Sequence, residues 1–340
     1  LHLQDKGNSR GVVALEAVEP GELLVHVPES QCLIGREWSH LAESFAKELR
    51  QPERLPVAYV DLLPQAEEVD SAFMWPEAEL QNHLMGTGLL EEALAMQAEV
   101  KVRESSASCT PAELWRTEVL LRSRSYKDQQ NGEDVWVVLP WIDLFNYRPD
   151  MPCAVPRAVA DGFELRSEVA VGKGEEVFAD YHAKSTVELA LSYGYIPAGL
   201  NPHPSRIRWP VPKLGGLHGR VQRQLGLHMA EVSIACPLPA ALIIWHNLTV
   251  IDDTDLRRLL QLGHESHLTE ITPKTADMIA AKVAERLDTL GRQRSCPHAE
   301  RCQETRHGML AAAVRDEEAA ILQAMLKALR GLGGSVDLCP

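Results

Sequence analysis

The sequence predicts an α+β protein, in which a β-rich region is interrupted by a helical block and followed by a mostly helical tail. β-forming residues dominate residues 11–27 and again 135–181, and turn signals such as Glu19-Pro20-Gly21 divide them into strands. Between these regions, at about residues 36–126, apolar side chains recur at helical spacing. The same spacing dominates from residue 217 onward. These changes of period decide the predicted fold class.

A length of 340 residues is about twice that of an average domain, so we expect two domains. The first is expected at residues 1–200, with the helical block inserted at about 36–126. A second, mostly helical domain is expected at 201–340. The breaker Asn201-Pro202-His203-Pro204 marks the boundary, because such a run interrupts both helices and strands.

Three stretches of the helical block are predicted to be helical. Its first helix carries one apolar face, formed by Trp38, Leu41, Ala42, Phe45 and Leu49. Residues 77–104 are predicted to be helical, with an interruption near Gly86. Thr110 and Glu113 have the spacing of a capping box, in which each side chain satisfies a free backbone donor of the other. A helix should therefore begin there and end near Tyr126.

Strand character returns after the helical block. Residues 135–139 and 163–169 are rich in β-branched or alternating apolar side chains, and a further strand is expected at 176–181. Ser185 and Glu188 then form a second capping-box pattern. In the tail we expect one short strand near residues 207–211 before the helices begin.

Three tyrosines gather around the end of the last predicted strand. Tyr181 ends that strand, and a helix at 186–193 is stopped by Gly194, a residue that tolerates the left-handed conformation. A helix of this length is only about 12 Å long, since each residue adds 1.5 Å. It can therefore return Tyr193 and Tyr195 to the neighbourhood of Tyr181.

The composition of the chain limits the classes of partner that it is expected to bind. The formal net charge is −14, which repels nucleic acid and anionic membrane surfaces at long range. The longest apolar runs, such as residues 240–245, are far shorter than the roughly 20 residues of a membrane-spanning helix. We therefore expect neither a nucleic-acid nor a membrane partner. Seven scattered cysteines favour a reducing, intracellular compartment, without distinguishing cytoplasm, nucleus and plastid.

Two further patterns do not support a site. Gly172-Lys173-Gly174 lacks the spacing of a phosphate-binding loop and lies between strands, so it is interpreted as a hairpin turn. Four possible metal ligands lie close together in the sequence: Cys296, His298, Cys302 and His307. Their spacing does not match known zinc motifs, so no metal is expected. From the residues alone, Tyr181 and its neighbours are better interpreted as turn residues and core aromatics than as a site.

Several short motifs follow one another in a fixed order. They are Ser9-Arg10-Gly11-Val12-Val13, Tyr59-Val60-Asp61-Leu62-Leu63-Pro64, Ser123-Arg124-Ser125-Tyr126, Asp143-Leu144-Phe145-Asn146-Tyr147, and residues 176–181 and 188–195. This ordered set resembles the SET-domain protein methyltransferases, and most of all the branch that contains the Rubisco large-subunit lysine methyltransferase. The resemblance covers residues 8–202. It implies a β-rich SET core with a helical insertion, followed by a substrate-binding helical domain.

The resemblance also implies an activity and its residues. The family transfers a methyl group from S-adenosylmethionine to a protein, so we expect a lysine of a non-histone protein as substrate, and a monomeric enzyme. Tyr181 would be the catalytic tyrosine and would also contact the cofactor. The other implied cofactor-binding residues are Asn8, Ser9, Arg10, Asn146 and Tyr147. The implied substrate-binding residues are Arg124, Tyr126, Asp143, Tyr193 and Tyr195.

Two departures from the family pattern leave alternatives open. Ser9 stands where the family usually has a glycine, and Tyr147 stands where a histidine follows the asparagine. A catalytically silent SET-fold binding module is one alternative, in which these side chains block the cofactor. The other is a protein-histidine N-methyltransferase, but Tyr126 occupies a position where those relatives carry a polar amide. Tyr181 is retained, so an active lysine methyltransferase is favoured.

Overall fold

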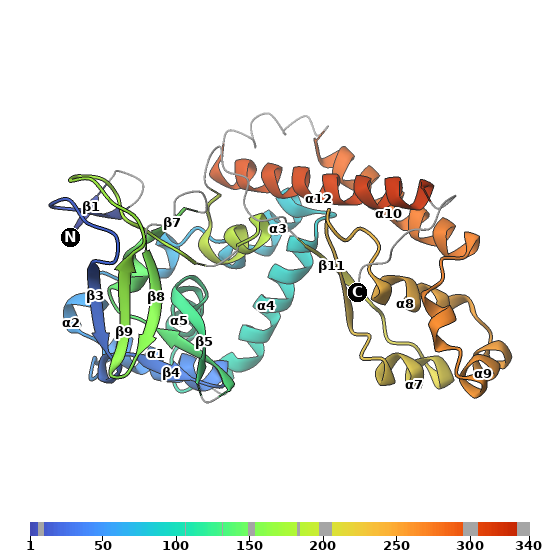
Figure 1. Ribbon diagram of the computed structural model, residues 1–340, viewed down its shortest axis with the longest axis horizontal. Coiled ribbons are helices and arrows are strands. Elements are labelled where there is room, and N and C mark those ends of the chain that lie inside the picture. Colours follow the sequence, from blue (N-terminus) through green and yellow to red (C-terminus); the bar gives the residue numbers. More distant parts are fainter. Residues whose placement is uncertain are drawn as a thin grey trace. The chain divides into compact units, whose positions relative to one another are not determined.

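The structure is a computed structural model, which describes residues 1–5, 10–105, 107–130, 132–148, 154–181, 184–196, 206–294 and 305–331. The chain forms two compact units, and Figure 1 colours it along the sequence. The first unit comprises Leu1–Trp75, Ala93–Lys184 and Glu188–His203. The second comprises Pro76–Glu92, Ser185–Val187 and Pro204–Pro340. Two short segments from the first 200 residues thus belong to the second unit.

The main sheet of the first unit has five strands in the order β3-β9-β8-β10-β7. Their bounds are Leu23–Pro28 for β3, Asn146–Tyr147 for β7, Ala154–Val159 for β8, Gly162–Ser167 for β9 and Phe178–Ala179 for β10. Strands β3, β9 and β8 lie side by side and pair antiparallel (Figure 1). Strand β10 instead runs parallel to β7, with Ala179 opposite Tyr147. This pairing brings the two tyrosine-bearing segments together.

Two smaller sheets complete the β structure of the first unit. Strands β4 (Leu33–Gly35), β6 (Glu133–Val138) and β5 (Ser125–Gln130) form one, and β1 (His2–Asp5) and β2 (Arg10–Val13) form the other. The core is apolar and includes Val27, Leu139, Phe145, Leu165 and Ala179. The predicted strand at 176–181 is reduced to the two residues of β10, because the chain leaves the sheet before Tyr181.

The helical insertion forms as predicted. Its helices are α1 (Trp38–Arg50), α2 (Val57–Val60), α3 (Glu77–Leu84), α4 (Gly88–Glu104) and α5 (Pro111–Arg124), with short 3-10 turns at Ala66–Glu68 and Ala72–Met74. Leu41, Ala42 and Phe45 bury the apolar face of α1. The Thr110–Glu113 capping box is present at the start of α5. Further 3-10 turns lie at Glu29–Gln31 and Ile142–Leu144.

The helix that follows Tyr181 is less regular than predicted. It begins as α6 (Thr186–Glu188) and continues as a π-helix, η5 (Leu189–Tyr193), which ends at Gly194 with φ of 70°. A Cβ at this glycine would lie 2.1 Å from the carbonyl oxygen of Asp70. Gly194 is therefore needed both for the left-handed turn and for the close approach of the backbone.

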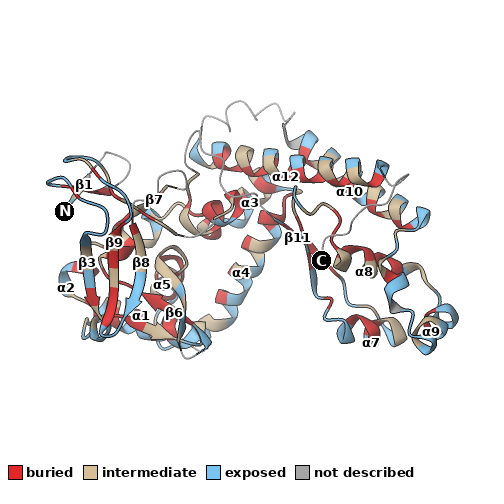
Figure 2. Ribbon diagram, viewed as in Figure 1, coloured by how far each residue is buried: buried red, intermediate tan, exposed pale blue. Residues whose placement is uncertain are grey.

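The second unit is mostly helical and has its own core. Its helices are α3, α7 (Gly216–Gln224), α8 (Ala240–Val250), α9 (Asp253–Leu262), α10 (Pro273–Arg294) and α12 (Arg306–Arg330), with a 3-10 turn at Glu265–Thr269. Figure 2 shows a buried stripe along α12, in which Ile321, Leu322 and Met325 are fully buried.

One strand of the second unit was not predicted. Residues 217 onward are mostly helical, but Met229–Val232 forms β12, which pairs antiparallel with β11 (Ile207–Pro210). The α+β class is confirmed, since the sheets of the first unit and the helices occupy separate parts of the chain. No helix in the described part of the chain is long and apolar enough to cross a membrane.

Candidate active site

Tyr181 lies at the centre of an aromatic cluster in the first unit. Its ring stacks on that of Tyr147 with centroids 5.2 Å apart and planes inclined by 16°. The ring of Tyr193 lies 5.3 Å away, and the ring of Tyr126 lies 6.3 Å away in an edge-to-face arrangement. The Tyr181 hydroxyl donates to the carbonyl oxygen of Phe145 at 2.5 Å. The side chain is therefore fixed by a hydrogen bond at its tip and by rings around it.

Each of the rings around Tyr181 lies on a different element. Tyr147 ends β7, Tyr126 lies on β5, and Tyr193 is the last residue of the π-helix. Tyr195 follows the Gly194 turn, and its hydroxyl donates to the Tyr147 carbonyl at 3.3 Å. As the sequence predicts, the short helix returns Tyr193 and Tyr195 to the neighbourhood of Tyr181.

Burial keeps the phenols of this cluster protonated. Loss of water raises the pKa of Tyr181 and of Tyr126 well above the usual tyrosine value, because a buried phenolate is poorly solvated. The same burial raises the pKa of Tyr195 to about 12. At neutral pH every one of these side chains therefore offers a hydroxyl, which can both donate and accept a hydrogen bond.

A buried ion pair lies beside the cluster. The guanidinium of Arg124 donates to the Asp143 carboxylate at 3.4 Å and to its carbonyl oxygen at 3.1 Å. The Tyr59 hydroxyl donates to the same carboxylate at 2.5 Å. Burial raises the pKa of Asp143, and Arg124 and Tyr59 partly offset that rise. With Tyr59 included, all six tyrosines of the chain belong to this region.

Asn146 connects the cluster to the first strands. Its side-chain amide donates to the Arg10 carbonyl and to the Glu176 carboxylate, both at 2.7 Å. Glu176 also lies close against the backbone of the second strand, since a Cβ at Gly11 would meet its carboxylate oxygen at 2.2 Å. Arg10, Asn146 and Glu176 thus form a polar junction where β2 and β7 approach the segment before β10.

Most of the predicted site residues converge in the structure. The tyrosine cluster holds Tyr126, Tyr147, Tyr181, Tyr193 and Tyr195, and the adjoining polar groups are Arg10, Arg124, Asp143 and Asn146. Asn8 and Ser9 lie outside the described residues.

Three residues were missed as parts of the site: Tyr59, Trp141 and Glu176. Trp141 adopts a left-handed φ of 71° just before the turn that carries Asp143, and its ring packs edge-on against Tyr59. Such a conformation is costly for a bulky residue and often marks a functional region. No short sequence pattern predicts this conformation of Trp141. Glu176, by contrast, lies in the matched motif at 176–181 and could have been singled out.

The fold defined by these units is that of a SET domain with a helical insertion and a helical domain after it. The crystal structure of the SET domain of LSMT bound to lysine and AdoHcy matches with a TM-score of 0.76 at 20% identity, over 97% of this chain and 86% of that one. Rubisco LSMT bound to AdoMet matches with a TM-score of 0.75 at 20% identity, over 96% and 86% of the two chains. The expected resemblance to this branch is confirmed.

Sequence comparison supports the same branch. The chain is 27% identical over 234 residues to the ribulose-1,5 bisphosphate carboxylase/oxygenase large subunit N-methyltransferase, chloroplastic, of Pisum sativum. This alignment covers 57% of the chain and 47% of that protein, so the chain spans about half the length of its curated relative. No family model matches the chain.

Proposed function

We propose that the chain is an S-adenosylmethionine-dependent protein-lysine N-methyltransferase that acts on a non-histone protein. The observation that carries this proposal is the fixed position of Tyr181, whose hydroxyl is held by Phe145 inside a cage of tyrosine rings. The names of the similar proteins support it, since the pea relative is an N-methyltransferase of the Rubisco large subunit. One solved SET domain is bound to lysine and AdoHcy.

The polar junction fits the amino-acid end of S-adenosylmethionine. Both N–H groups of the Asn146 amide are used, by Arg10 and Glu176, so the amide is held in one orientation. No described residue hydrogen-bonds its Oδ1, which leaves an acceptor for an ammonium group. Arg10, Asn146 and Tyr147 would hold the cofactor with Tyr181 beside it, and the sequence adds Asn8 and Ser9. When bound, the cofactor supplies a methyl group activated on positively charged sulfur.

The tyrosine cage would prepare the substrate lysine. A lysine side chain has a pKa near 10.4 in water, so its nitrogen carries a proton at pH 7 and has no free electron pair. The half-buried rings of Tyr181 and Tyr193 exclude water, and loss of water lowers the pKa of an ammonium group. The main contribution of the chain is then to position the lysine nitrogen against the methyl group. Such positioning accelerates the transfer without a covalent intermediate on the enzyme.

The hydroxyl of Tyr181 has a defined role in that positioning. Its proton is donated to the Phe145 carbonyl, so its oxygen lone pairs remain available to accept an N–H from the incoming amine. Tyr126 contributes an aromatic edge and no side-chain amide, which supports lysine over histidine as the target. Arg124 and Asp143 would hold the wall of the channel in place through their buried ion pair.

The substitution Tyr181→Phe tests this role. It keeps the ring contacts and removes the hydroxyl, so we expect methyl transfer to fall by at least about 100-fold while cofactor affinity is unchanged. Methyl transfer is measured by incubating the enzyme with labelled cofactor and a cell extract, followed by mass spectrometry of the labelled residue. Tyr195→Phe is the matched control, because it removes only a 3.3 Å hydrogen bond, and it should cost less than about tenfold. Full activity in Tyr181→Phe would remove Tyr181 from its role.

A silent binding module is the second candidate, and one observation favours it. The ring of Tyr147 covers one face of Tyr181, where the family has a histidine. Calorimetric titration of the folded protein with S-adenosylmethionine and with AdoHcy separates the two functions. Binding of both supports the enzyme, and failure of both to bind supports the silent module.

Three further expectations belong to the same proposal. Residues 201–340 would bind the protein substrate, the enzyme would act as a monomer, and it would work inside the cell. The net charge of −14 supports a substrate surface rich in lysine. The name of the pea relative gives a chloroplast location for that protein.

A further inference from the structure

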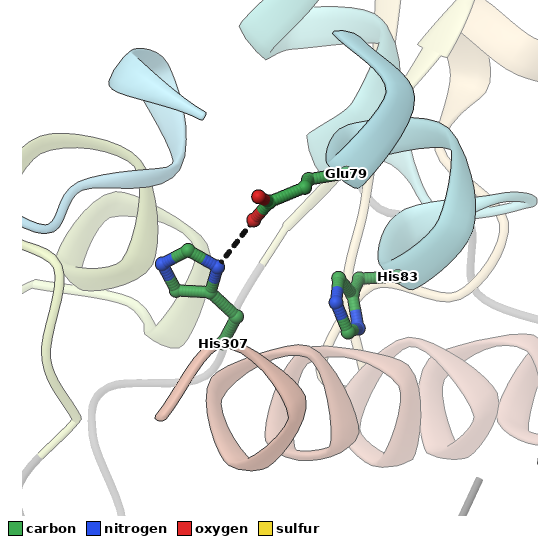
Figure 3. Close-up of side chains that lie close together, drawn as sticks. All are labelled: Glu79, His83 and His307. Atoms are coloured by element: carbon green, nitrogen blue, oxygen red, sulfur yellow. Dashed lines mark hydrogen bonds and ion pairs between the residues drawn. The ribbon is translucent and has the colours of Figure 1, made fainter. Parts of the chain in front are cut away.

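A second group of side chains that could bind a ligand lies in the second unit, outside the tyrosine cluster. Glu79 and His83 are four residues apart on α3, so they project from the same face of that helix. His307 is the second residue of α12. Figure 3 shows Glu79 and His83 projecting from α3 toward the start of α12, where the His307 ring meets the Glu79 carboxylate.

The spacing of these side chains suits a metal ion. Their ligand atoms all lie within 4.8 Å of one another. His307 Nδ1 and a Glu79 carboxylate oxygen form a hydrogen bond of 2.7 Å, and the imidazole rings of His83 and His307 lie 6.2 Å apart at 84°. Four-coordinate zinc at about 2.1 Å from nitrogen and oxygen ligands keeps those ligands roughly 3.4 Å apart. Small rotations about the side-chain bonds would reach this geometry.

We propose that Glu79, His83 and His307 form a binding site for a divalent transition-metal ion, with Zn²⁺ as its preferred occupant. Two imidazole nitrogens and one carboxylate oxygen are a donor set that zinc accepts, and three protein ligands leave the fourth position for water. The ion would replace the hydrogen bond between Glu79 and His307, and metal binding at such ligands releases protons.

The surroundings are compatible with this role. All three side chains are partly buried, so they remain open to solvent, and the lower local dielectric strengthens the attraction between an ion and its ligands. The Arg315 guanidinium lies beside the site and donates to the His83 carbonyl oxygen.

This site differs from the metal pattern considered in the sequence. That pattern joined His307 to Cys296, His298 and Cys302, and these three residues lie outside the described part of the chain. In the structure His307 instead meets two residues 228 and 224 positions earlier in the chain, Glu79 and His83. The spacing of histidines and cysteines along the sequence therefore gives no indication of the site.

A bound ion would fasten α3 to the start of α12 within the second unit. These two helices already pack together, although they are far apart in the sequence. An ion that binds the folded state and not the unfolded chain stabilises the fold by mass action. The role that follows is structural. Zinc at this site would anchor the residue 76–92 segment to the final helix, independently of methyl transfer.

Metal titration of the full chain tests the proposal. We expect one equivalent of Zn²⁺ to bind in competition with a chromophoric chelator, and to raise the melting temperature. The conservative substitutions Glu79→Gln, His83→Gln and His307→Gln should each weaken binding at least tenfold and abolish that rise, since each removes one ligand. Circular dichroism without metal establishes that each variant is folded.

Two controls make the result decisive. His228→Gln changes an exposed histidine of the same unit and should leave zinc affinity unchanged. A double variant Cys296→Ser and Cys302→Ser tests the alternative ligands and should also leave it unchanged. The proposal is overturned if no equivalent of zinc binds, or if binding survives in His83→Gln and His307→Gln. It is equally overturned if binding is lost only in the cysteine variant. None of these outcomes depends on methyltransferase activity.

Discussion

Two contacts hold the side chain of Tyr181 in place. A hydrogen bond to Phe145 fixes its oxygen, and the stacked ring of Tyr147 fixes its plane. Aromatic pairs of this kind contribute about 0.5–1.5 kcal/mol beyond the area they bury. Tyr147, at the position where the family usually has a histidine, thus supports the Tyr181 ring. This gives Tyr147 a structural reason to be an aromatic residue.

The buried phenols predict a loss of stability at alkaline pH. An unfolded tyrosine loses its proton near pH 10, whereas burial raises the pKa of folded Tyr195 to about 12. The folded-state pKa is the higher one, so this stabilisation is complete below pH 10 and is lost as the pH rises toward 12. A spectrophotometric phenolate titration combined with circular dichroism measures both events. Ionisation of all tyrosines near pH 10 in a protein that stays folded would contradict the prediction.

At the scale of elements, the turn after the π-helix depends on one glycine. Gly194 needs a left-handed backbone, and its missing Cβ makes room for the Asp70 carbonyl. Gly194→Ala should therefore lower the free energy of unfolding by more than the roughly 1–2 kcal/mol of the left-handed conformation alone. It should also displace Tyr193 and reduce the methyl transfer proposed above.

Gly174→Ala is the matched control for this substitution. Gly174 has a φ of 82° and no atom within 4 Å of its Cβ position, so alanine there meets only the conformational cost. The difference between the two variants in chemical denaturation isolates the contact with Asp70. Equal losses of stability in both variants would show that this contact contributes nothing.

Elements with local signals were predictable from the sequence, and elements made by distant pairing were not. The α5 start was predicted because Thr110 and Glu113 satisfy one another's backbone within a single turn. Strand β12 was missed because its partner β11 lies about 20 residues earlier, and neither strand has a hairpin turn beside it. The π-helical form of η5 depends on tertiary packing, and helical periodicity does not reveal it.

The same distinction applies to the candidate site. Tyr193 and Tyr195 were expected near Tyr181, because a short helix limits how far the chain can travel. The bond from Tyr59 to Asp143 joins residues 84 positions apart, so no pattern within either segment indicates it. The resemblance to a known family supplied roles for single residues, and periodicity alone did not.

At the scale of the whole molecule, one buried carboxylate joins distant parts of the second unit. Glu318 on α12 accepts from the Gly88 N–H at 2.7 Å and from Arg286 at 3.1 Å. Arg286 also donates to the Gly86 carbonyl. Burial raises the pKa of Glu318 to about 6, and Arg286 offsets part of that effect. This side chain therefore links residues 76–92 to both α10 and α12.

Glu318→Ala should destabilise the second unit by about 3–5 kcal/mol, because it leaves the Arg286 charge buried without its partner. Hydrogen exchange should show faster exchange in residues 76–92 and 306–330 together, with little change in the strands of the first unit. Glu285→Ala on α10 is the control, since that side chain is exposed and its loss should cost less than about 0.5 kcal/mol. Unchanged protection of residues 76–92 in Glu318→Ala would contradict the connection.

The Gly88–Glu318 hydrogen bond also bears on how the protein is made. Its two residues are 230 positions apart. Ribosomes add about 5–20 residues per second, so Gly88 waits roughly 10–50 s for its acceptor to be synthesised. During that interval α3 lacks α12, one of the helices that it packs against. Nascent chains of this protein should therefore depend on a chaperone until α12 has been synthesised.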